Sequence, residues 1–65
     1  MSTAELERER DYELVLAWRR DELLRAGYGR RAALAIALDP TIDLHLAVDL
    51  IRSGCPEQTA LRILL

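Results

Sequence analysis

The first 26 residues of this 65-residue chain contain neither glycine nor proline, and Gly27 follows them. Ser2 and Glu5 have the spacing of a capping box, in which each side chain satisfies a backbone N–H group of the first helical turn. Gly27 suits the left-handed conformation that often follows a helix. The sequence therefore predicts one helix over residues 3–26, which is about 36 Å long at 1.5 Å per residue.

A helix of this length exceeds what so short a chain can cover. A compact domain of this size has a radius of gyration of about 11 Å, so we expect the first helix to project beyond the rest of the protein. The projecting part is predicted to be residues 1–12. It is highly charged and prone to fray, because its helicity depends on its cap and on weak ion pairs.

Three shorter helices follow, predicted over residues 30–38, 43–53 and 56–65. Asp39-Pro40 ends the second helix, because the residue before a proline avoids helical geometry. Asp43 is a suitable cap for the third, and Pro56 suits the first turn of the fourth. With 51% apolar residues, 3 Gly and 2 Pro, the chain predicts an all-α bundle of four helices in one domain, residues 1–65.

Helical periodicity gives the first helix two apolar faces. The broader one is predicted to lie in the core and contains Tyr12, Val15, Leu16, Leu23 and Ala26. Leu14 and Trp18 lie one turn apart on the opposite side. In the third helix, Leu46 and Leu50 form a similar second strip. These strips leave two alternatives. Either the fourth helix covers the strip of the third and Leu14 and Trp18 pack against the apolar surface that is still uncovered, or some of these extra apolar faces form an interface with another chain.

Residues 23–51 resemble a ubiquitin-associated (UBA) domain. That family has a leucine, a Met-Gly-Phe turn, an alanine-rich helix and a capped third helix, matched here without a gap by Leu23, Ala26-Gly27-Tyr28, Ala33, Asp43-Leu44 and residues 47–51. The resemblance implies a three-helix core that binds partners through the turn and the end of the third helix, here Leu50-Ile51. This chain differs in having Ala26 in place of the methionine and in having a fourth helix.

The C-terminal part also resembles a helix-turn-helix DNA-binding motif. Residues 54–64 are similar to its turn and recognition helix, and the third helix would be the supporting helix. The alternative function is therefore that of a small DNA-binding regulator that uses residues 44–65. The net charge of −2 and the position of Glu57 at the helix entry disfavour it, because affinity for DNA depends on neutralising phosphates.

No pattern in the sequence predicts catalysis, a metal site or a cofactor. His45 and Asp49 have the spacing of a surface pair. Cys55 is the single cysteine, so the chain has no internal disulfide, and a reducing compartment, the cytoplasm, is expected. There is no apolar run long enough to span a membrane and no signal peptide. Lys, Asn and Phe, whose codons are AT-rich, are absent, which indicates a GC-rich, bacterial genome.

The sequence thus predicts a small non-catalytic protein-interaction module that self-associates through its first helix. A two-fold interface needs only one self-complementary patch, which makes a second copy the simplest partner. We predict no small-molecule substrate and no membrane partner. The candidate partner-binding residues are Leu14, Trp18, Ala26, Gly27, Tyr28, Leu46 and Leu50.

Overall fold

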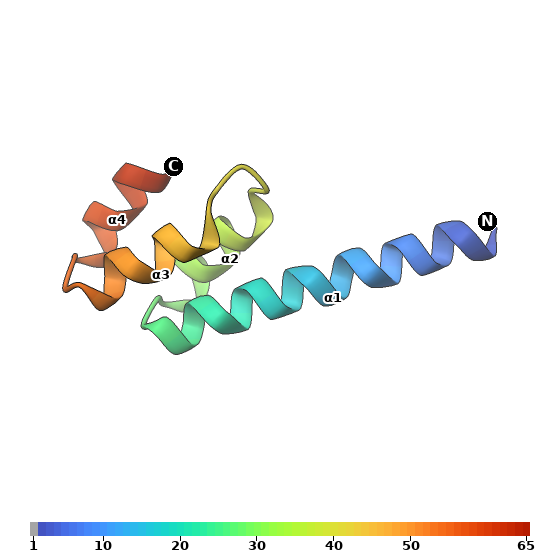
Figure 1. The fold of residues 1–65 in the computed structure, drawn as a ribbon, viewed down its shortest axis with the longest axis horizontal. Coiled ribbons are helices and arrows are strands. Elements are labelled where there is room, and N and C mark those ends of the chain that lie inside the picture. Colours follow the sequence, from blue (N-terminus) through green and yellow to red (C-terminus); the bar gives the residue numbers. More distant parts are fainter. Residues whose placement is uncertain (1) are drawn as a thin grey trace.

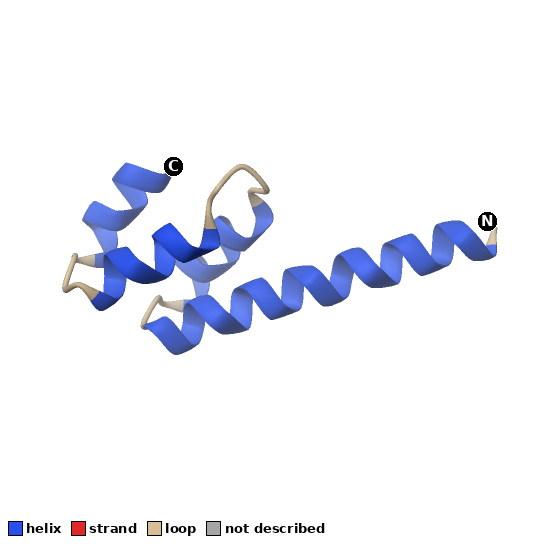
Figure 2. Ribbon diagram, in the orientation of Figure 1, coloured by secondary structure: helices blue, strands red, loops and turns tan. Residues whose placement is uncertain are grey.

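A computed structural model describes residues 2–65 and contains four helices within them. They are α1 (Thr3–Ala26), α2 (Arg30–Leu38), α3 (Leu44–Arg52) and α4 (Glu57–Leu64). No strand occurs within residues 2–65, so the predicted all-α fold is confirmed. The three shorter helices gather around the C-terminal end of α1, and the N-terminal half of α1 extends away from them (Figures 1 and 2).

The helix ends follow local signals in the sequence. The Glu5 N–H donates to Ser2 Oγ at 3.2 Å and the Ser2 N–H donates to Glu5 Oε2 at 3.4 Å, which completes the capping box. Gly27 ends α1 with φ of 125°, a conformation that a residue with a Cβ rarely adopts. Both ends of α3 and of α4 lie one residue inside the predicted ranges: Asp43 and Pro56 are the N-caps, α3 ends at Arg52 and α4 ends at Leu64.

The projection of α1 is longer than the predicted residues 1–12. Exposed side chains continue through residue 15, and the molecule measures 45 × 19 × 18 Å. Tyr12 and Val15, which were predicted to lie in the core, are 60% and 56% exposed, so that prediction is wrong. The reason is length: α2 and α3 have nine residues each, about 14 Å, and cover only the C-terminal part of a 24-residue helix.

The core lies where the C-terminal part of α1 meets α2 and α3. Leu23 and Ile36 are its largest fully buried side chains. Three alanines with no exposed surface, Ala33, Ala47 and Ala60, lie on α2, α3 and α4 respectively. Because a methyl group occupies little space, these positions let the helix backbones approach closely.

Arg19 fastens the loop between α2 and α3 to α1. Its Nη2 donates to the carbonyl oxygens of Asp39 and Ile42, both at 3.2 Å. Within the loop, the Thr41 hydroxyl and backbone N–H both donate to Asp39 Oδ1, and these two hydrogen bonds, with the charge of Arg19, hold the pKa of Asp39 below its ordinary value. The loop therefore has a defined shape where it lies beside α1.

Candidate interaction surfaces

Four exposed apolar side chains lie on α1 where it leaves the bundle. We call Tyr12, Leu14, Val15 and Trp18 together the α1 belt. Leu14 and Trp18 are 62% and 56% exposed and lie one helical turn apart, as predicted from the sequence. Leu14 and Trp18 are neighbours on one side of α1, and Tyr12 and Val15 lie on the face that contains Leu23. A contiguous exposed apolar patch is uncommon on a soluble monomer and marks a surface for contact with another molecule.

The turn at residues 26–28 contributes to the core as well as to the surface. Tyr28 is 3% exposed, and its hydroxyl donates to the carbonyl oxygen of Ala47 at 2.7 Å. A side chain in this position cannot present its ring to a partner, so its predicted role as a contact residue is corrected to one of fixing the turn against α3. Gly27 remains exposed at the surface of the turn, and Ala26 is half-buried.

The turn also lies next to the ends of α3 and α4. A Cβ on Gly27 would lie 3.7 Å from Ile51 Cγ1, so the turn and the C-terminal end of α3 are in contact. On its other side, the Gly29 N–H donates to Glu57 Oε1 at 2.6 Å, which places a carboxylate from the start of α4 at the N-terminus of α2. A negative charge there is favourable, because that end of a helix carries a partial positive charge.

The environment of Tyr28 gives a prediction for alkaline pH. Burial of the phenol raises the pKa of Tyr28 above its ordinary value of 10.0, and the negative charges of Cys55 and Glu57 raise it further. Because the folded-state pKa lies above the unfolded-state value, the stabilisation from the neutral phenol is complete below about pH 10 and is lost as the pH rises through the folded-state pKa. We therefore expect the free energy of unfolding in urea to fall above pH 10.

Two matched variants check this assignment. Tyr28→Phe should remove the part of the alkaline fall that comes from this phenol, and at pH 7 it should lower the free energy of unfolding by about 1 kcal/mol through the lost hydrogen bond. Tyr12→Phe should leave the alkaline fall intact, because Tyr12 is exposed in the folded protein. An unchanged alkaline fall in Tyr28→Phe would contradict the assignment.

The second apolar strip of α3 is only partly covered. Leu46 is exposed, whereas Leu50 is half-buried and packs against the core. Of the two alternatives left open by the sequence, coverage of the strip by the fourth helix therefore does not hold for Leu46. Leu46 lies on α3, whereas Leu14 and Trp18 lie on α1.

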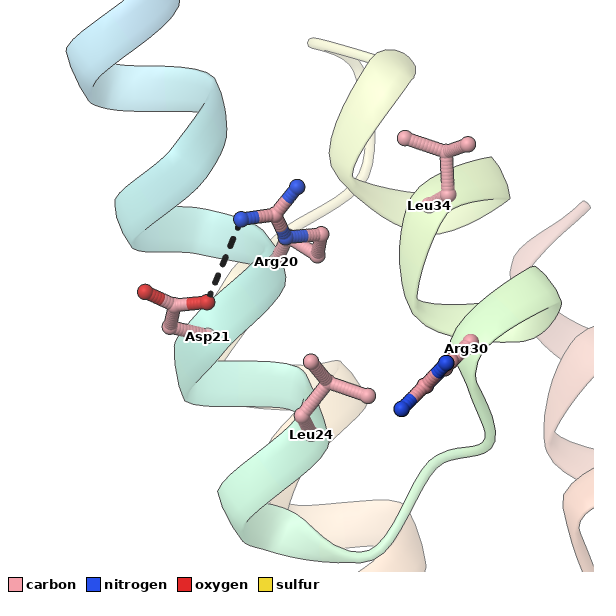
Figure 3. Close-up of a pocket in the computed structure, with 5 residues that line it drawn as sticks. All are labelled: Arg20, Asp21, Leu24, Arg30 and Leu34. Carbon is pink, nitrogen blue, oxygen red and sulfur yellow. Dashed lines mark ion pairs between the residues drawn. The ribbon is translucent and has the colours of Figure 1, made fainter.

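A pocket that the sequence did not reveal lies between α1 and the start of α2. It has a volume of about 340 Å³ and is lined by Arg20, Asp21, Leu24, Arg30 and Leu34. Leu24 and the side chain of Arg30 face one another across the gap between the two helices, and Arg20 pairs with Asp21 at 3.5 Å (Figure 3). The lining of the pocket thus combines two leucines from different helices with three charged side chains.

The surface around α4 does not favour DNA binding. Glu57 lies at its first residue and is engaged with the Gly29 N–H, and Arg52 and Arg62 are the two basic residues between positions 44 and 65. Phosphate neutralisation would need more positive charge along this face.

Comparisons with models of known protein families, with curated proteins and with solved structures each find no match for this chain. None of the helices formed by residues 2–65 has the length and hydropathy to cross a membrane. Within the same residues, no three His, Cys, Asp or Glu side chains are grouped so that they could hold a metal ion.

Proposed function

We propose that this protein is a small, non-catalytic interaction module that self-associates through α1. The observation that carries the proposal is the exposure of the α1 belt on a helix that projects beyond its own bundle. The UBA-like organisation of residues 23–51 and a cytoplasmic, bacterial setting belong to the same proposal. A single cysteine is consistent with a reducing compartment.

The physical reason for association is the cost of leaving the belt in water. Full burial of a large apolar side chain contributes about 1.5–3 kcal/mol, and a two-fold dimer buries each contributing side chain twice. Leu14 and Trp18 also offer a contact of low entropic cost, because they lie on a helix that the capping box and the bundle hold in place. Small domains commonly gain stability by such association.

Light scattering and sedimentation at micromolar concentration test the proposal. We expect a mass of twice 7.4 kDa for the unaltered chain and a return toward 7.4 kDa when Leu14→Ala and Trp18→Ala are combined. Trp18 is the single tryptophan, so its emission should shift to longer wavelength as the dimer is diluted. The matched control is Ile63→Ala, an exposed apolar residue on α4, which should leave the mass unchanged. A monomer at every concentration up to several hundred micromolar would overturn the proposal.

A further inference from the structure

Charge is unevenly distributed along α1 and the start of α2. Residues 3–13 contain five acidic and two basic side chains, a net charge of −3. Residues 14–31 contain five basic and two acidic side chains, a net charge of +3. Two copies of α1 packed in parallel would place like charges together, whereas an antiparallel pair places the acidic half of each copy beside the arginine-rich half of the other.

One stripe of α1 leads directly into the pocket between α1 and α2. Its members are spaced alternately by four and three residues, which brings them onto one side of a helix: Leu6, Arg10, Glu13, Ala17, Arg20 and Leu24. Leu6 is exposed at the acidic end of the stripe. At the other end, Leu24 lines the pocket together with Leu34 of α2. The stripe therefore carries an exposed apolar side chain at one end and, at the other, a pocket with two leucines in its lining.

We propose that Leu6 of one copy occupies the Leu24/Leu34 pocket of a second copy, so that the two α1 helices pack antiparallel about a two-fold axis. This inference rests on the proposed self-association and specifies its geometry. The two apolar contacts are about 27 Å apart along the helix, since 18 residues separate Leu6 from Leu24. The small side chain of Ala17 lies opposite the partner's Glu13 near the centre, where it lets the two helices approach closely.

In this register Arg10 lies opposite the partner's Arg20 within the stripe, and carboxylates on the two edges flank this pair of arginines. A two-fold axis perpendicular to antiparallel helices brings the same edge of each stripe together. On one edge, Glu9 comes beside the partner's Arg20. Glu5 lies on the same edge and faces the side of the partner where its α2 carries Arg30. On the opposite edge, Arg10 comes beside the partner's Asp21. Because of the two-fold symmetry, each of these ion pairs forms twice.

The same geometry accounts for part of the α1 belt. Leu14 lies at the edge of the stripe near its middle, so Leu14 of the two copies meets close to the two-fold axis. Trp18 follows one turn later and lies farther around the helix from the centre of the stripe, so the indole borders the contact. One interface thus uses Leu6, Leu14 and the pocket together.

Charge reversal tests this register. Glu9→Arg alone should weaken the dimer by about tenfold or more, because the new arginine faces the partner's Arg20 twice. Arg20→Glu alone should weaken it less, because the new glutamate lies beside the partner's Glu9 but opposite the partner's Arg10. The chain that carries both substitutions should recover an affinity within about threefold of the original. Asp11→Arg makes the same change of charge on the side of α1 away from the stripe and should have little effect. Circular dichroism checks that each variant keeps its helices.

Cross-linking tests the direction of the helices independently. In a Cys55→Ser background, a chain carrying Glu13→Cys is mixed with one carrying Ala17→Cys and oxidised. Antiparallel packing brings these two positions within disulfide range, so the mixed disulfide should form faster than either symmetric one. Faster symmetric disulfides, or a double charge reversal that fails to restore affinity, would overturn the register while leaving self-association intact. A chain that stays monomeric would overturn both proposals.

Discussion

Leu23→Ala is expected to lower the free energy of unfolding by about 2–5 kcal/mol. Leu23 has no exposed surface and lies at the contact of α1 with the rest of the bundle. Its truncation removes apolar burial and leaves a cavity that the surrounding helices can only partly fill. A chain of this length has a total stability of roughly 3–10 kcal/mol, so this one substitution is expected to unfold a measurable fraction of the protein at 25 °C.

Urea unfolding followed by far-ultraviolet circular dichroism measures this effect. The same substitution at an exposed position, Leu46→Ala, is the control and should cost less than about 1 kcal/mol. Equal losses in the two variants would mean that the core does not lie where α1 meets α2 and α3. Both proteins are compared at the same concentration, because self-association adds to apparent stability.

The helices could be predicted from the sequence because their signals are local. The capping box, Gly27, Asp39-Pro40 and Asp43 act within a few residues of the ends that they define. The exposure of Leu14 and Trp18 follows from the same periodicity, since they lie opposite the face that contains Leu23.

Burial along the axis of α1 could not be predicted in the same way. Periodicity gives the direction in which a side chain points, and it does not say how far along the helix the covering elements extend. Tyr12 and Val15 share a face with Leu23, yet they lie beyond the reach of α2 and α3. The covering lengths depend on how short helices pack, which is a property of the whole bundle.

The contacts around the turn and the pocket depend on residues far apart in the sequence. The Gly29 N–H and Glu57 are 28 positions apart, and the Tyr28 hydroxyl and the Ala47 carbonyl are 19 positions apart. Leu24 and Leu34 line one pocket from two different helices. Arg20 and Arg30, on the two sides of the turn, were the feature of the sequence that could have indicated this pocket. Only the packing of α2 on α1 brings these arginines together with Leu24 and Leu34.

Ala47→Leu is expected to lower the free energy of unfolding by about 1–3 kcal/mol, because the added atoms have no space in a packed core. Ala47 has no exposed surface, and its carbonyl oxygen accepts the hydrogen bond from the buried Tyr28 hydroxyl. A larger side chain would move α3 away from its neighbours and lengthen that hydrogen bond. The free energy of unfolding in urea measures the loss, and the tyrosine environment can be followed by near-ultraviolet circular dichroism.

The matched control is Ala35→Leu, the same change at an exposed position of α2. Alanine and leucine have similar helix propensities, so this variant should unfold within about 0.5 kcal/mol of the original chain. If Ala47→Leu were equally well tolerated, the close approach of α3 to the turn would not depend on a small residue. The bundle would then have room that its buried alanines do not indicate, and the matched alanine positions of the UBA-like pattern would lose their physical basis in this chain.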